Sequence, residues 1–445
     1  MNRPANRTRA SRRPAGPRDV AVTALVRADQ GGWVNLLLPS LLRGSGLDER
    51  GRAAVTDLVN STTRVLGTLD AELGRRSRQP LDRLEPLVRA GLRLGAYELL
   101  YGGTPPHAAV AEAVGAVRRA GGPGPAGYVN AVLRRLADRP PRWPDPKADP
   151  LGWATGRGAH PAWIATEALA RLGPEGLVAL AEADNRPPAV TLRATPGRAT
   201  AAELLAELAE ARYRATRTKL SPECVTLAGG DPGALAAVAE GRAVVQDEGS
   251  ALVAPAVGAK PGDAVVDLAA GPGGKAGHLA ALGAMVLALE LHPARAAMVA
   301  ETAARIGVAA RLQTVVGDAR RAPLAPGRAD AVLVDAPCTN LGSLRRRPEA
   351  RWRHDQAEIG ELVALQSRML DAAALAVRPG GSVLYSVCTW TRAETEEVVA
   401  AALARLPGLR PAPLGGPLGD APARQLWPHT DGTDGIFLAR FTRAV

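Results

Sequence analysis

The sequence predicts a three-part protein, in which an all-helical domain and a small α+β module precede a doubly wound, parallel α/β domain. Apolar residues recur at helical spacing between Asp19 and about Asp138. A proline-rich joint follows, and from about Ser250 onward strand-like and helix-like segments alternate. Alternation of this kind is typical of a parallel sheet covered by helices.

Composition sets the broad class of the protein. The 445 residues are enough for roughly three domains of ordinary size. We find no apolar stretch long enough to cross a bilayer and no apolar core of a secretory signal, so we expect a cytoplasmic protein. Three cysteines without CxxC or CxxH spacing argue against a disulfide framework and a zinc site. The formal charge of +11 favours a nucleic-acid partner, although codon usage can also produce an arginine-rich chain.

The first part divides into a tail and a helical domain. Residues 1–18 carry six arginines and no carboxylate. We therefore expect a disordered basic tail, which is either solvated or a loose RNA-binding arm. Residues 19–138 are predicted to form the helical domain, with helices within 25–42, 53–73, 84–100 and 107–120.

Residues 139–249 are predicted to form a linker and a small α+β module. The linker is rich in proline. Helix-like segments then follow at 160–173 and 200–211, and strand-like segments at 189–194 and 242–250. Cys224 lies in this region without a catalytic context, and we assign it no role because such a cysteine usually serves packing.

Residues 250–445 are predicted to form the doubly wound domain. Ligands of such sheets bind at the carboxyl ends of the strands, so the residues that follow each strand are the candidates for a site. The predicted strands lie within 263–270, 284–291, 312–318, 329–337 and 381–388.

A glycine-rich loop follows the first of these strands. Its glycines let backbone approach a ligand closely where a helix begins. The loop also satisfies the loose GxGxxA dinucleotide pattern, whereas a Walker A loop is excluded because alanine follows Lys275. The candidate cofactor-binding residues of the loop are Ala269, Ala270, Gly271, Pro272, Gly273, Gly274 and Lys275.

Carboxylates end the second and third strands. Glu290 is placed to accept hydrogen bonds from both hydroxyls of a ribose, and Asp318 to bind the amino group of an adenine. NAD and S-adenosylmethionine both carry that ribose, so Glu290 does not separate these cofactors. A surface carboxylate at a strand end is otherwise unremarkable.

Two of the three cysteines, Cys338 and Cys388, follow the fourth and fifth strands. Each taken alone is most simply a small buried hydrophobe. Their polar neighbours, such as Asp335 beside one and Thr389 beside the other, instead favour a catalytic role at the ligand-binding edge.

These motifs resemble those of the RNA 5-methylcytosine methyltransferases, in particular the RsmB/Sun/Fmu family that acts on 16S ribosomal RNA. The segment DLAAGPGGK resembles the cofactor loop DLCAAPGGK of the family. DAPCTNLGSLRRRPEARW and YSVCTWTRAETE resemble its two cysteine motifs, DAPCSGLGVLRRRPDIRW and YSTCTLTPEENE. NLLLPSLL and PHAAVAEAV resemble the NusB-like RNA-binding domain that precedes the enzyme in this family, so the resemblance covers nearly the whole chain.

The resemblance implies a fold and a reaction. The fold is an all-α NusB-like N-terminal domain, a small α+β linker module and a Rossmann-like class I methyltransferase domain. The reaction is transfer of a methyl group from S-adenosylmethionine to carbon 5 of a cytosine in 16S rRNA, conventionally cytosine 967. RNA is then the partner, and we expect a monomer that uses no metal and no membrane.

The resemblance also implies roles for single residues. Carbon 5 of cytosine becomes nucleophilic once a thiolate has added to carbon 6, and Cys388 is the implied thiolate. Cys338 takes part in release, while Asp335 hydrogen-bonds ring nitrogen 3 and lines the cofactor site. Four residues depart from the family pattern and leave this chemistry intact. Ala269 and Gly271 do not affect the implied cofactor role, whereas Asn340 and Val387, next to the two cysteines, alter details of base positioning.

Basic residues after Cys338 are candidates for RNA contact. Arg345, Arg346 and Arg347 offer contacts to phosphate and Trp352 a stacking surface, although a solvated basic loop has the same composition. Three alternative functions remain open. They are a 5-methylcytosine methyltransferase for tRNA or another rRNA site, a non-catalytic RNA-binding protein, and an NAD-dependent oxidoreductase.

Overall fold

The protein is described here by a computed structural model covering residues 16–321 and 325–445, and most of the predicted basic tail lies outside these residues. The chain divides into two compact units, which we describe separately. Unit 1 contains residues up to Asn185 together with 347–353, and unit 2 contains 186–346 and the chain from His354 to the end.

Unit 1 is helical, as predicted. Its helices are α1 (Pro17–Asp29), α2 (Val34–Arg43), α3 (Glu49–Arg64), α4 (Leu66–Gly74), α5 (Pro86–Leu100), α6 (Pro106–Gly121), α7 (Pro123–Asp138), α8 (Pro150–Thr155), α9 (Ala162–Asn185) and α16 (Ala350–Arg353), with a 3₁₀ turn η1 (Leu81–Arg83). Proline begins α1 and α5, where its missing N–H costs no intrahelical hydrogen bond. The apolar faces of these helices form two buried clusters.

Two helices of this unit lie near predicted domain limits. Helix α1 begins at Pro17, where the Arg18 guanidinium donates to the buried Glu98 carboxylate at 2.6 Å. The helical segment that begins near residue 160 is predicted as part of the small module, and in the structure α9 packs on α8 within unit 1.

The first part of unit 2 is a four-stranded sheet with order β2-β3-β1-β4. Its pairs are all antiparallel. The elements here are β1 (Val190–Ala194), α10 (Ala201–Glu210), β2 (Ala215–Arg217), β3 (Cys224–Leu227), η2 (Pro232–Ala234), α11 (Ala236–Ala239), β4 (Ala243–Val245), α12 (Glu248–Ala251) and α13 (Val253–Ala256). Cys224 is fully buried in β3, so the packing role assumed for it fits the structure.

The larger sheet of unit 2 has the strand order β10-β12-β9-β8-β5-β6-β7, with β11 paired to β12. Its strands are β5 (Ala264–Asp267), β6 (Met285–Glu290), β7 (Leu312–Val316), β8 (Ala329–Asp335), β9 (Val377–Val387), β10 (Leu409–Pro411), β11 (Ala423–Gln425) and β12 (Phe437–Arg443). The five strands from β9 to β7 are parallel, as predicted. The sheet as a whole is mixed, because β12 returns antiparallel to β9 and pairs β10 and β11 in the same sense.

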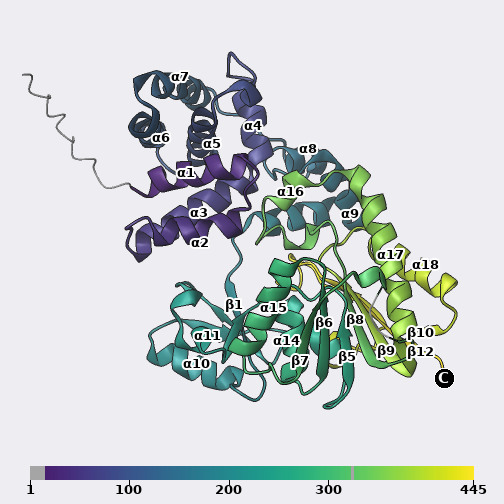
Figure 1. The fold of residues 1–445 in the computed structure, drawn as a ribbon. Helices are drawn as coiled ribbons and strands as arrows, with labels where there is room; N and C mark the ends of the chain where they lie inside the picture. Colours follow the sequence, from purple (N-terminus) through teal and green to yellow (C-terminus); the bar gives the residue numbers. More distant parts are fainter. Residues whose placement is uncertain (1–15, 322–324) are drawn as a thin grey trace, which may run out of the picture. The chain divides into compact units, whose positions relative to one another are not determined.

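Helices cover both faces of this sheet. They are α14 (Gly274–Ala281), α15 (Pro293–Arg305), α17 (Ile359–Ala376) and α18 (Glu396–Arg405), with short 3₁₀ turns η3 (Ala319–Arg321), η4 (Leu341–Ser343), η5 (Gln356–Glu358) and η6 (Gly416–Leu418). Figure 1 shows α14 and α15 beside β6 and β7, and α17 beside β8 and β9, as their contacts require.

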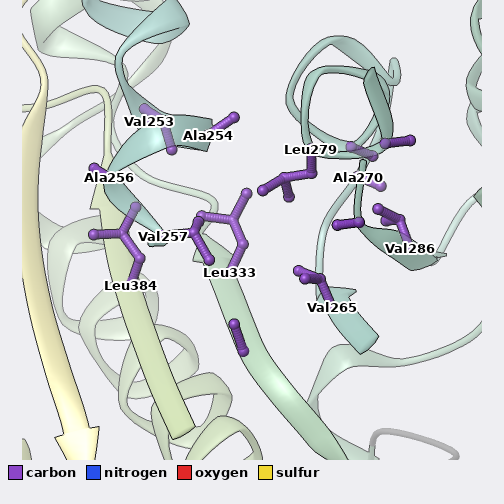
Figure 2. Close-up of a cluster of buried hydrophobic side chains, with 14 of the residues drawn as sticks. Val253, Ala254, Ala256, Val257, Val265, Ala270, Leu279, Val286, Leu333 and Leu384 are labelled. Atoms are coloured by element: carbon purple, nitrogen blue, oxygen red, sulfur yellow. The ribbon is translucent and has the colours of Figure 1, made fainter. Parts of the chain in front are cut away.

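Alternate residues of each strand supply the two cores. Val265 of β5 packs with Leu279 of α14 and Leu333 of β8 on one face (Figure 2). Its neighbour Val266 points the other way and packs with Met369 of α17. Each fully buried side chain of this kind contributes roughly 2 kcal/mol of transfer free energy, so the two faces hold the strand ends in register.

Among the described residues, no helix combines the length and the apolar character that a membrane crossing requires.

Candidate active site at the carboxyl ends of the parallel strands

The glycine-rich loop joins β5 to α14 and lies against Glu290 at the end of β6. The Gly271 N–H donates to Glu290 Oε2 at 3.1 Å, and a Cβ atom at Gly271 would lie 2.2 Å from that oxygen. Gly273 has φ 107°, which glycine adopts without strain. These two glycines therefore allow the close approach that the sequence predicted for the loop.

Glu290 is nearly buried and is held by backbone. Its Oε1 accepts from the His292 N–H at 3.0 Å, while its Oε2 takes the Gly271 N–H. Arg295 supports the same arrangement, because its Nη2 donates to the Gly271 carbonyl at 2.7 Å. The carboxylate is thus fixed in orientation, and each oxygen keeps a second lone pair for a ligand hydroxyl.

Asp267 is the last residue of β5, and its carboxyl group has a raised pKa. Burial, reinforced by the negative charge of Asp335, raises the pKa of Asp267 to about 7. Its Oδ1 accepts from the Ala269 N–H at 3.2 Å, whereas its Oδ2 is buried and has no hydrogen-bond partner among the described residues. An unsatisfied buried carboxylate oxygen is costly, and a cationic ligand group would remove that cost.

Asp318 follows β7, and its carboxylate is already hydrogen-bonded to Arg320. Both of its oxygens accept from the Arg320 guanidinium, with a shortest distance of 2.5 Å. This hydrogen bonding, aided by the backbone N–H of Arg320, lowers the pKa of Asp318 to about 2. An adenine amino group would have to share the carboxylate with this arginine.

Asp335 and Lys275 form an ion pair between the end of β8 and the start of α14. Lys275 Nζ lies 2.5 Å from Asp335 Oδ1. Burial alone would lower the pKa of Lys275, but the charge of Asp335 and the hydrogen bond to it outweigh burial and raise it. The charge of Cys388 raises the pKa of Lys275 further.

The two predicted cysteines lie together. The sulfurs of Cys338 and Cys388 are 3.4 Å apart, because Asp335 of β8 is in register with Ser386 of β9 and both cysteines follow two or three residues later. Cys338 is buried, and its hydrogen bond to Cys388, with burial second, raises its pKa well above the usual range. Cys388 is only half-buried, so it is the more accessible thiol.

Asn340 links the two cysteines. Its Oδ1 accepts from the Cys388 thiol at 3.1 Å, and its Nδ2 donates to the Cys338 carbonyl at 2.8 Å. The backbone of Asn340 is left-handed, with φ 60°, a conformation that asparagine tolerates better than most residues. This departure from the family's glycine therefore adds a polar group beside the predicted nucleophile.

The candidate RNA-binding residues have partners within the protein. Arg345 donates to the Gly432 carbonyl at 3.0 Å, and Arg346 donates to Asp247 at 2.8 Å. Trp352 belongs to unit 1, where its indole N–H donates to the Thr63 carbonyl at 2.7 Å. Its ring packs so closely on Gly67 that a Cβ there would lie 2.3 Å from ring carbon Cζ3.

Arg347 is the first residue of the same unit 1 segment. The neighbouring Arg351 is fully buried and donates to the carbonyls of Arg64 and Ala159, at 2.9 Å each. The segment 347–353 is therefore held by packing in unit 1, a role that its basic composition alone does not suggest.

Two groups at this site have no role in the sequence predictions, Asp267 and Glu394. The signal for Asp267 was its position directly before the glycine loop. No local signal marks Glu394, because its contacts come from residues far away in the sequence.

The parallel sheet, the glycine loop and the acidic strand ends are those of a Rossmann-like domain that binds a nucleotide-containing cofactor. Comparisons with known proteins agree. The family model described as 16S rRNA methyltransferase RsmB/F matches residues 254–442. Those of the NusB family and of the RsmF/B-like ferredoxin-like domain match residues 16–138 and 160–232.

Similar proteins extend the match to nearly the whole chain. The provisionally named methyltransferase Rv1407 of Mycobacterium tuberculosis is 43% identical, covering 97% of this chain and 98% of its own. Ribosomal RNA small subunit methyltransferase B of Thermus thermophilus is 37% identical with the same coverage. The crystal structure described as PH0851 superposes with a TM-score of 0.84 at 25% identity, covering 97% of this chain and 100% of that one.

The chain therefore belongs to the RsmB/F family of 16S rRNA methyltransferases. This confirms the predicted fold class, with its NusB-like helical domain, and the predicted class of enzyme, an RNA methyltransferase dependent on S-adenosylmethionine. The family match leaves the alternative function of an NAD-dependent oxidoreductase without support.

Proposed function

We propose that the protein methylates carbon 5 of a cytosine in 16S rRNA, cytosine 967 by resemblance, through a covalent bond between Cys388 and carbon 6 of the base. The observation that carries the proposal is the pair of thiols 3.4 Å apart after the ends of β8 and β9, where Lys275 pairs with Asp335 at the end of β8. A nearby cation favours the thiolate, which is the nucleophilic form of cysteine.

The residues present fit S-adenosylmethionine. The unpartnered Oδ2 of Asp267 suits a positively charged group, and the fixed carboxylate of Glu290 suits the hydroxyls of a ribose. With Asp318, Asp335 and the loop 269–275, these residues form the proposed cofactor site. The bound cofactor supplies an electrophilic methyl group.

Each residue then has one task. The Cys388 thiolate adds to carbon 6 of the cytosine and makes carbon 5 nucleophilic. Asp335, in its protonated form, donates a hydrogen bond or its proton to ring nitrogen 3 and so stabilises the electron-rich adduct. After methylation the carbon 5 proton passes to a water molecule, its electron pair re-forms the double bond between carbons 5 and 6, and the bond between Cys388 sulfur and carbon 6 breaks. The Cys338 thiol, 3.4 Å from the departing sulfur, assists this release by donating a proton to it.

RNA is the proposed partner of the whole chain. The NusB family match, the formal charge of +11 and the names of the relatives support it. We keep the arginines 345–347 as proposed RNA contacts, since a paired arginine can exchange its carboxylate partner for a phosphate. We propose 19–138, 139–249 and 250–445 as the domain limits, a monomeric state without a metal, and the cytoplasm as the location.

The deciding experiment is transfer of labelled methyl from S-adenosylmethionine to unmodified 16S rRNA, with mapping of the modified nucleoside. Wild type should form 5-methylcytosine at one position, and Cys388→Ala should form none. Cys224→Ala is the matched control, because Cys224 is buried in β3 outside the site. Methylation by Cys388→Ala at the wild-type rate would overturn the nucleophile, and methylation of tRNA alone would overturn the substrate.

A further inference from the structure

Glu394 is a fully buried acidic residue just behind the two cysteines. It lies in the turn between β9 and α18 and has no exposed surface. Its carboxylate accepts two hydrogen bonds from Thr339, which directly follows Cys338: one from the backbone N–H at 2.9 Å and one from the hydroxyl at 2.6 Å. The carboxylate thus holds the loop that carries Cys338.

The same carboxylate holds the loop that carries Cys388. It accepts from the hydroxyl of Thr389, directly after Cys388, at 3.3 Å, and from the hydroxyl of Thr391 at 2.9 Å. The hydroxyls of Thr339 and Thr389 also lie 2.8 Å apart, in hydrogen-bond contact with each other. Thr339 and Thr389, which follow the two cysteines, therefore both contact the Glu394 carboxylate and also contact each other.

A third element completes the cluster. Gln366 of α17 donates to Glu394 Oε1 at 3.2 Å and to the Pro337 carbonyl, directly before Cys338, at 2.9 Å. The Glu394 carboxylate makes no hydrogen bond to the first turn of α18, so helix capping does not account for it. A buried carboxylate with five donors from three segments is rigid, since each charge-assisted hydrogen bond restrains it.

We infer that Glu394 is a positioning residue that sets the distance between the sulfurs of Cys338 and Cys388. The inference rests on the proposed function, in which both thiols act on one cytosine in succession. Addition and release then require both sulfurs at fixed places around the same ring, and a misplacement of about 1 Å costs on the order of 100-fold in rate.

Glu394→Gln tests this inference, since it keeps the shape of the side chain but removes the charge and one acceptor. The first readout is the rate at which diamide, a thiol oxidant, joins Cys338 to Cys388 in the full-length protein without RNA, followed by peptide mass spectrometry. The second readout is kcat for methyl transfer, with the Kd of S-adenosylhomocysteine as the check on the cofactor site.

We expect Glu394→Gln to slow the crosslink at least about tenfold and to lower kcat by on the order of 100-fold, with the Kd unchanged within about twofold. Thr389→Val, which removes one hydroxyl, should do the same to a lesser degree, and Thr389→Ser, which keeps the hydroxyl, should restore both rates. The threonine pair decides the matter if Glu394→Gln does not fold.

A wild-type crosslinking rate in Glu394→Gln and Thr389→Val would overturn the inference, even with kcat lowered, because the loss would then not act through the spacing of the cysteines. Wild-type kcat in both variants would overturn it too. Neither result touches the proposed function, which fails instead if Cys388→Ala still methylates RNA.

Discussion

Acidification should destabilise unit 2 through His278. This side chain of α14 is fully buried, and its Nε2 lies 2.8 Å from Glu223 Oε2. Burial, followed by the positive charge of the buried Arg193, lowers the pKa of His278 to about 4, although Glu223 opposes the shift. The imidazole is therefore neutral in the folded protein at pH 7.

The size of the effect follows from the two pKa values. Unfolded histidine titrates near 6.5, and the interval down to about 4 corresponds to roughly 3 kcal/mol. Because the folded pKa is the lower one, the stabilisation is present above pH 6.5 and is lost as the pH falls towards 4. At pH 4.5 about 2 kcal/mol of it should be gone.

The assay compares wild type with His278→Gln, which keeps a hydrogen-bonding side chain but does not titrate. Urea unfolding is followed by hydrogen exchange of β5 and β6, which reports on unit 2 alone. Between pH 7 and 4.5, wild type should lose about 2 kcal/mol more of its free energy of unfolding than the variant. Carboxylates that do not contact His278 titrate alike in both proteins and cancel, whereas Glu223, whose pKa the contact with His278 lowers, is replaced by Gln in both backgrounds. Equal losses would refute the assignment of a buried, neutral His278.

Three further changes have expected outcomes. Lys275→Met should slow alkylation of Cys388 by iodoacetamide about tenfold, because the thiolate loses its electrostatic interaction with the ammonium; an unchanged rate would remove Lys275 from nucleophile activation. Cys338→Ala should leave addition intact but slow release, so protein covalently linked to RNA should accumulate on denaturing gels, and its absence would contradict a role in release. Trp352→Ala should destabilise unit 1 by about 2 kcal/mol in urea unfolding, since the half-buried ring loses its packing and its bond to the Thr63 carbonyl; full stability with weakened RNA binding would instead favour a stacking role.

Much of the fold could be predicted from the sequence, because the spacing of hydrophobic residues reflects which side chains pack in the core. The alternation of strands and helices after Ser250 located all five parallel strands, and with them the edge where Glu290 and Cys388 lie. The antiparallel return of β12 was not predicted as such, since a strand's own residues do not state the direction of its partner.

Long-range contacts explain the rest of what the sequence did not reveal. Trp352 reads as an exposed aromatic in a basic loop, yet its partner Thr63 lies 289 residues away. Glu394 reads as one more acidic residue before a helix, yet its carboxylate joins Thr339, 55 residues earlier, to the Cys388 loop. Local patterns report helix faces and strand ends, whereas such pairings exist only once the tertiary structure has formed.

The proposed division of labour between the two cysteines follows from their burial. A nucleophile needs access, and Cys388 is half-buried. Cys338 is buried, and its pKa is raised by the hydrogen bond to Cys388 and by burial, so near neutral pH it keeps its proton. If their roles were exchanged, the attacking thiolate would have to form at the buried sulfur, where a charge is least stable. The arrangement therefore favours attack by Cys388, with Cys338 as a neutral thiol 3.4 Å from the sulfur that must leave.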